Sequence, residues 1–170
     1  MFCLARPTSS NVPMRVFIDT EFTNLRDREL ISLALVAENG AEFYGECSDF
    51  DPSRCSEFVR ETVLPQLGRP AGRAMPLAQL RTEAMAWLLR IPVRERPILC
   101  YDNDADLRIL ESRIGRLPKR WQQENIWTRL NSAGLETFFA EHGHQHHALW
   151  DARANLACFQ SKSGSGLGQI

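Results

Sequence analysis

The sequence predicts an α/β fold, in which a mixed five-stranded sheet carries helices on both faces. Three runs rich in β-branched, aromatic and other apolar residues open the chain, and segments with helical spacing then alternate with short apolar runs. An antiparallel opening followed by such alternation is typical of a mixed sheet with helices packed against it. The 170 residues, 44% hydrophobic and 24% charged, suit one globular domain.

The first three strands are expected over residues 14–19, 29–37 and 41–46. Asn39 and Gly40 separate the second run from the third, and Asn-Gly between two such runs is a strong hairpin signal. Two later runs, residues 97–101 and 124–130, are predicted as the remaining strands because they are short and rich in apolar residues.

Helices are predicted where apolar residues recur with helical spacing. Pro76 is well placed in the first turn of the second helix, and Gly115 is a plausible stop for the third. Asp51 or Ser53 precedes the first helix as a candidate cap. The five predicted helices cover residues 56–67, 76–90, 102–115, 132–143 and 146–159.

Charge and cysteine content restrict the expected partners and compartment. The formal net charge of -1 leaves no broad basic field, so a nucleic-acid partner would need a local patch or metal ions. Five cysteines without a CxxC pair favour free thiols in a reducing cytoplasm, and no apolar run is long enough to span a membrane. Residues 14–160 are expected to form the domain, between a flexible leader (1–13) and a flexible tail (161–170).

Acidic residues occur at predicted inward-facing positions in three separate segments. Asp19 and Glu21 alternate on the first strand, so their side chains point to the same face. Asp106 lies near the apolar face of the third helix, and Asp151 lies at the edge of a stripe of small and apolar residues on the last helix. Four converging carboxylates would repel one another without cations. The pattern therefore predicts a divalent metal site with oxygen ligands.

These motifs resemble the DEDD superfamily of 3′-to-5′ exonucleases, in its histidine-bearing DEDDh branch. The matching residues are the D-x-E pair Asp19 and Glu21, then Asp106 within YDNDADLRIL, and His146 with Asp151 within HHALWDA. The order and spacing agree over residues 15 to 160, and the sequence looks most similar to the small bacterial 3′-to-5′ exoribonucleases. One departure is Asp102, at a position where many members carry Asn.

The resemblance implies a ribonuclease-H-like fold and metal-dependent hydrolysis at a 3′ end, releasing nucleoside 5′-monophosphates. Two Mg²⁺ or Mn²⁺ ions would be held by Asp19, Glu21, Asp106 and Asp151, and His146 would serve as general base. Glu21, Phe22 and His146 would seat the terminal nucleotide of a single strand, with RNA favoured over DNA. A DNA-directed exonuclease or proofreading subunit, and a non-catalytic protein that binds nucleic-acid ends, are the alternatives. A homodimer is compatible with the sequence.

Several residues near these motifs are expected to have structural rather than catalytic roles. Asp102 and Asp104 are expected to act as a helix cap and a first-turn acid. A zinc site in the histidine cluster is disfavoured because no second group of ligands accompanies it, so His142, His144 and His147 are expected to be exposed and His147 to be replaceable. Four tryptophans could stack on bases but are expected instead to pack in the core or at its rim: Trp87, Trp121, Trp127 and Trp150.

Overall fold

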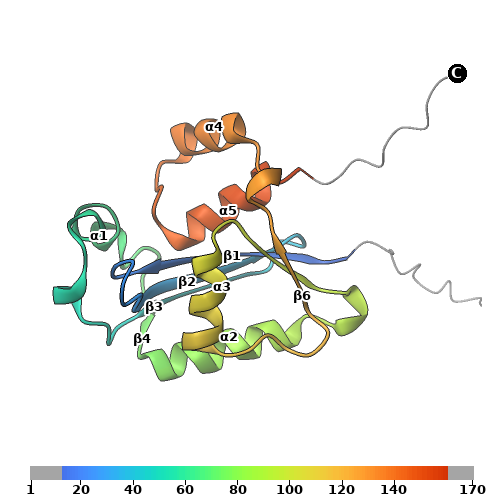
Figure 1. Cartoon of the computed structure of the whole chain (residues 1–170), viewed down its shortest axis with the longest axis horizontal. Helices are drawn as coiled ribbons and strands as arrows, with labels where there is room; N and C mark the ends of the chain where they lie inside the picture. The colour runs from blue at the N-terminus through green and yellow to red at the C-terminus, as the bar shows by residue number, and fades with distance from the viewer. Residues whose placement is uncertain (1–12, 161–170) are drawn as a thin grey trace, which may run out of the picture.

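The computed structural model describes residues 13–160, which form a six-stranded mixed sheet with helices on both faces (Figure 1). The strand order is β4-β3-β2-β1-β5-β6. All of the predicted leader except residue 13, and the whole predicted tail, lie outside the described residues. The strands are β1 (Arg15–Phe22), β2 (Leu30–Ala37), β3 (Glu42–Cys47), β4 (Ala74–Met75), β5 (Ile98–Tyr101) and β6 (Gln122–Asn125).

The prediction of five strands is wrong in number and in the position of the last strand. The additional strand β4 has two residues, which is too short to produce an alternating pattern. The predicted strand at 124–130 lies too far along the chain, because β6 ends at Asn125 and Trp127–Arg129 form a 3-10 turn. β6 is an edge strand whose residues are mostly exposed, so it carries no apolar signal.

The central strand β1 pairs with an antiparallel neighbour on one side and a parallel neighbour on the other. It pairs with β2 in an antiparallel register and with β5 in a parallel one. The predicted hairpin between β2 and β3 is present, and Gly40 adopts a φ of 85° in its turn. The Asn39 side chain accepts a hydrogen bond from the Ala41 N–H at 3.0 Å, which stabilises the turn.

The five predicted helices are all present, although two are shorter than expected. The first breaks near Pro65 into an α-helix and a 3-10 turn over Leu64–Gln66, and the third continues as a π-helical turn over Leu110–Ile114. Gly115, with a φ of 147°, ends that turn as predicted. The helices are α1 (Glu57–Thr62), α2 (Leu77–Arg90), α3 (Asp104–Ile109), α4 (Ser132–His142) and α5 (Ala148–Cys158).

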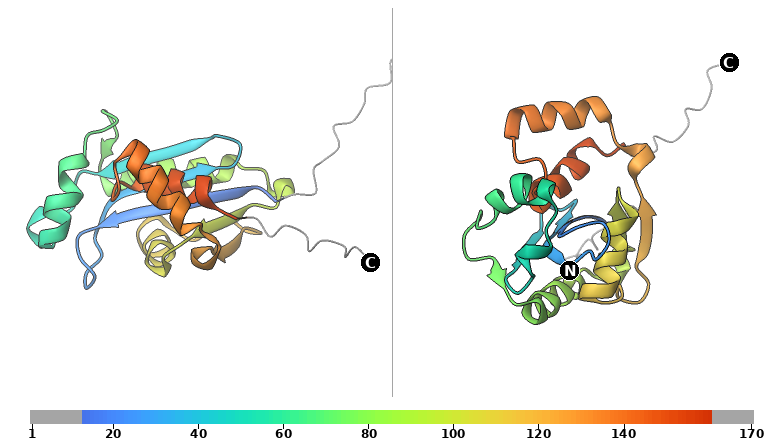
Figure 2. Two further views of the ribbon diagram at one scale, coloured as in Figure 1. Left: turned by 90° about the horizontal axis from the view of Figure 1, so that it is seen from above. Right: turned by 60° about the vertical axis from the view of Figure 1, so that its left-hand side comes forward.

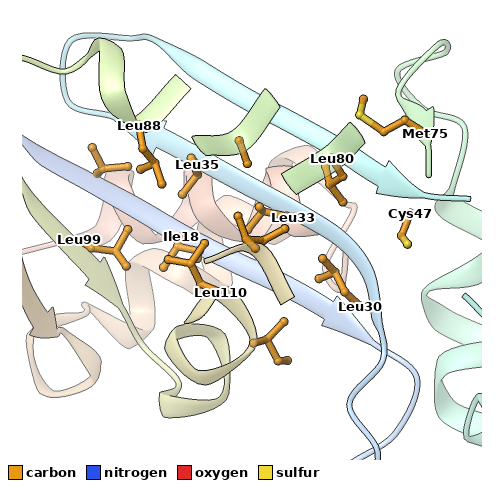
Figure 3. Packing of buried hydrophobic residues seen from close by; sticks show 14 of the residues in the cluster. Ile18, Leu30, Leu33, Leu35, Cys47, Met75, Leu80, Leu88, Leu99 and Leu110 are labelled. Atoms are coloured by element: carbon orange, nitrogen blue, oxygen red, sulfur yellow. The ribbon is translucent and has the colours of Figure 1, made fainter. Parts of the chain in front are cut away.

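Two apolar layers cover the sheet. On one face, Ile18 of β1 and Leu33 of β2 belong to a buried cluster with residues of α2 and α3 (Figure 3). On the other face, Ala148 and Ala152 of α5 pack against β2 and β3 residues, as the small-residue stripe predicts. Figure 2 shows α4 and α5 lying over the sheet, with α1 beyond one end of it.

The described cysteines agree with the expectation from the sequence, and Cys3 lies outside the described residues. Cys47, Cys55, Cys100 and Cys158 are free thiols, and all four are buried. Within residues 13–160, no helix is both long enough and apolar enough to cross a membrane.

Candidate active site

The candidate site lies where the parallel strands β1 and β5 end at the same edge of the sheet. Phe17 pairs with Cys100, so a continuation of this register places Asp19 beside Asp102, the residue that directly follows β5. Crevices at the carboxyl ends of adjacent strands are common binding sites in α/β proteins.

Asp106 is fixed in this crevice by a residue of β1. Its side chain is 3% exposed, and its Oδ1 accepts hydrogen bonds from Thr20, at 3.1 Å from the backbone N–H and at 2.6 Å from the hydroxyl. Asn103 caps α3 by accepting from the Ala105 N–H, so Asp106 lies in the first turn of that helix. The acid predicted from the apolar face of the third helix is therefore buried against the strand that carries Asp19.

The last helix brings the remaining predicted residues to the same crevice. Asp151 lies in the first turn of α5, which packs against β1 and β2. His146 directly precedes the helix cap, with its backbone in the left-handed region at a φ of 64°. The carbonyls of Gln145 and His146 accept hydrogen bonds from the Gln66 side chain at 2.8 and 3.0 Å. The rings of Phe58 and His146 pack edge to face, with 4.8 Å between their centroids. These contacts hold the His146 loop.

The donor atoms fall into two adjacent groups that suit metal ions. Within each group, one oxygen or nitrogen atom of every residue lies within 4.8 Å of the others. Carboxylate oxygens and an imidazole nitrogen are suitable ligands for Mg²⁺ or Mn²⁺. One group comprises Glu21, His146 and Asp151, and the other comprises Asp19, Asp102 and Asp106.

The convergence of acids has a large electrostatic effect. Burial, followed by the charges of Asp106 and Asp151, raises the pKa of Asp19 well above its usual value. Burial raises the pKa of Glu21 to about 8, with further contributions from Asp151 and Asp106. Burial likewise raises the pKa of Asp106 and of Asp151 to about 7. Without a cation, the crevice therefore holds protons that isolated carboxyl groups would release at neutral pH.

A cleft of about 610 Å³ surrounds these residues. Phe22 lines it, as expected for a nucleotide contact, and so do Asn155 of α5 and Leu135 and Phe139 of α4. Trp127 also lines the cleft and is 66% exposed, so its predicted packing role is wrong. The 3-10 turn that carries Trp127 has no periodic sequence pattern that could have predicted its place at the cleft. Asn155 could have been predicted, because it lies one helical turn after Asp151.

Two further predictions about neighbouring residues are wrong. Asp102 does not cap α3, because Asn103 does, and it instead belongs to one of the two groups that could hold a metal ion. His147 is only 3% exposed, and its Nδ1 accepts from the Leu149 N–H to cap α5. Its Nε2 donates to the Arg69 carbonyl at 2.7 Å. The exposure of His142 and His144, and the place of Asp104 in the first turn of α3, are confirmed.

The other tryptophans have the packing roles predicted for them. Trp87 and Trp121 are partly buried against the main apolar cluster. The rings of Trp150 and His144 are stacked, with 5.3 Å between their centroids, and the guanidinium carbon of Arg153 lies 4.8 Å from the centroid of the Trp150 ring.

Known proteins resemble this chain in sequence and in fold. No family model matches. The chain is 48% identical to a 3′-5′ exoribonuclease of Mycobacterium tuberculosis over 61 residues, found in strains H37Rv and CDC 1551. These residues are 35% of this chain and 36% of the relative, so the match spans about a third of the curated relatives.

Solved structures extend the resemblance over most of the chain. Exonuclease I of Methylocaldum szegediense matches with a TM-score of 0.56 at 17% identity, over 85% of this chain and 39% of that one. Exonuclease I of E. coli in complex with a dA16 oligonucleotide gives a TM-score of 0.56 at 16% identity, with the same shares covered. A 3′-exonuclease that recognises the histone mRNA stem-loop gives 0.52 at 15% identity, over 86% of this chain and 62% of that one. The chain therefore has the ribonuclease-H-like fold of DEDD-type 3′-5′ exonucleases, and a third of its sequence is similar to mycobacterial 3′-5′ exoribonucleases.

Proposed function

We propose that the protein is a metal-dependent 3′-to-5′ exonuclease that removes nucleoside 5′-monophosphates from single-stranded nucleic acid, with RNA as the favoured substrate. The observation that carries this proposal is the meeting of Asp19, Glu21, Asp106, Asp151 and His146 in one cleft, from three separate segments of the chain. The similarity to the mycobacterial exoribonucleases supports RNA over DNA.

The acids would hold two divalent cations, Mg²⁺ or Mn²⁺. The raised pKa values support this proposal, because bound cations would allow the carboxylates to be ionised together at neutral pH. When bound, such cations neutralise the charge of a scissile phosphate and make a water molecule more acidic. Thr20 holds Oδ1 of Asp106 in place, which would orient this carboxylate for a ligand role.

His146 is the proposed general base. Burial lowers its pKa, so the imidazole is neutral near pH 7 and can accept a proton from the attacking water. The Gln66 hydrogen bonds and the Phe58 contact restrict the loop that carries it. A base held in this way loses little orientational freedom when substrate binds.

The apolar wall of the cleft would receive the terminal nucleotide. Phe22 follows the Asp19–Glu21 pair, and Trp127 presents a largely exposed ring to the same space. Aromatic rings stack on bases with little sequence preference, which suits an enzyme that removes successive nucleotides. Glu21, with His146, would contact the sugar and phosphate beside these rings.

The test is incubation of 3′-labelled and 5′-labelled single strands, RNA and DNA separately, with Mg²⁺, Mn²⁺ or a chelator. Stepwise shortening from the 3′ end only with metal, faster on RNA, is the expected result. Faster shortening of DNA together with co-purification of a polymerase would favour the proofreading alternative. Binding without shortening, whether or not metal is present, would instead identify a protein that binds nucleic-acid ends.

A further inference from the structure

We propose that Asp102 is a fifth carboxylate ligand, shared with Asp19 and Asp106 around one cation, and that Asn155 positions it. This inference rests on the proposed metal-dependent function. It concerns a residue at which the chain departs from the exonucleases it resembles, since many of those carry Asn there.

The backbone directs Asp102 into the cleft. β5 ends at Tyr101, and its parallel register with β1 places the next residue beside Asp19. Oxygens of Asp102, Asp19 and Asp106 all lie within 4.8 Å of one another. A cation between them would contact three carboxylates delivered by β1, the end of β5 and the first turn of α3.

One oxygen of Asp102 lacks the partner that its burial requires. Its Oδ1 is buried and has no hydrogen-bond partner among the described residues. Such an oxygen is costly unless a donor or a cation approaches it. Asp102 does not cap α3, because the Asn103 side chain accepts the bond from the Ala105 N–H.

Asn155 supplies the second observation. It lies on α5, lines the cleft and is 3% exposed, and its Nδ2 is also buried without a hydrogen-bond partner. Asp102 and Asn155 line the same cleft, so an unpartnered buried donor and an unpartnered buried acceptor both belong to it. An uncharged donor beside a ligating carboxylate fixes the orientation of that ligand, and removal of such a group typically weakens metal affinity about 10- to 100-fold.

The experiment titrates each folded variant with Mn²⁺ and follows the free-ion signal by electron paramagnetic resonance. Asp102→Asn removes the ligand charge with little change in shape, and Asp102→Glu keeps the charge but moves the oxygens. Glu136→Gln is the matched control, because Glu136 lines the same cleft but belongs to neither ligand group. Asn155→Ala tests the positioning role.

Asp102→Asn and Asp102→Glu should each weaken Mn²⁺ affinity by roughly tenfold or more, and Asn155→Ala should weaken it in the same direction. Glu136→Gln should follow the wild-type isotherm. Superimposable isotherms for wild type and Asp102→Asn would overturn the inference. It would also fail if Asp102→Asn lost Mn²⁺ affinity while Asp102→Glu kept it, because Asp102 would then contribute only its charge and would not bind the ion directly. If wild type shortens RNA only with metal while these variants bind Mn²⁺ normally, the proposed function survives and the inference fails. If wild type neither binds Mn²⁺ nor shortens RNA, the proposed function itself fails.

Discussion

His146 and His147 are adjacent in the chain but have opposite surroundings. The His146 ring lines the cleft, whereas His147 is buried between the Arg69 carbonyl and the ring of Tyr44. His146→Ala should lower the rate of 3′-end shortening by roughly 100-fold or more, because it removes the proposed general base. Thermal unfolding of this variant should change little, and single-turnover kinetics would measure the rate.

Substitution of His147 should instead lower stability. His147→Ala removes a helix cap and a buried hydrogen bond, so the free energy of unfolding should fall by about 1 kcal/mol or more. Chemical denaturation measures this loss. A His147 variant that retains wild-type stability, or a His146 variant that retains wild-type turnover, would contradict these assignments.

Trp127 allows a separate test of how the substrate is held. Trp127→Ala should weaken binding of a single-stranded oligonucleotide by about tenfold, within the range expected for one stacked base. Fluorescence anisotropy with a labelled strand, in Ca²⁺ to suppress turnover, measures the affinity. Leu89→Ala is the control, because Leu89 has the same 66% exposure but lies on α2 and does not line the cleft. Equal affinities for the two variants would exclude a stacking role for Trp127.

Among elements, the 3-10 turn Leu64–Gln66 is more important to the site than its three residues suggest. Its Gln66 side chain donates to two successive carbonyls in the loop before α5, about 80 residues later in the chain. Gln66→Ala should lower the shortening rate by roughly tenfold while Mg²⁺ dependence remains, because the His146 loop loses its tether. Gln79→Ala, on an exposed turn of α2, should have no effect. Steady-state kinetics on one RNA strand compares the two.

Local signals predicted the main elements because each has a short-range physical cause. Asn39-Gly40 sets the hairpin by turn geometry, and the small residues of α5 mark its sheet-facing side. The roles of Asp102 and Asn103 could not be separated in this way, because both are good cap residues at one strand-to-helix junction. The path of the chain after β5 decides which of them caps α3. This path depends on the packing of the whole sheet, so the local sequence does not predict it.

Across the whole molecule, the buried acids link stability to pH and metal. The pKa values of Glu21, Asp106 and Asp151 are raised to about 8, 7 and 7, so the folded chain retains protons that the unfolded chain has released. Stability in a chelator should therefore fall as the pH rises from about 6.5 to about 8. Burial also lowers the pKa values of His146 and His147, and this effect makes stability rise with pH below that window.

Melting temperatures measured with a chelator and with Mn²⁺ test this linkage. The chelated protein should lose thermal stability across the window, and Mn²⁺ should raise the melting temperature most at pH 8, where protons compete least. Asp19→Asn should reduce the pH dependence of the chelated protein, because it removes one of the repelling charges. A chelated wild type whose melting temperature rises from pH 6.5 to 8 would contradict the linkage.

The position of β1 at the centre of the sheet has a consequence for biosynthesis. This strand is translated before the other strands and holds two of the proposed ligands, but Asp151 and His146 are supplied by the last helical region in the described chain. A nascent chain that lacks α5 leaves one face of the sheet uncovered and presents no imidazole to the cleft. The proposed exonuclease activity should therefore emerge only after α5 has left the ribosome and docked, so an unfinished chain would not yet act on nucleic acid near the site of its own synthesis.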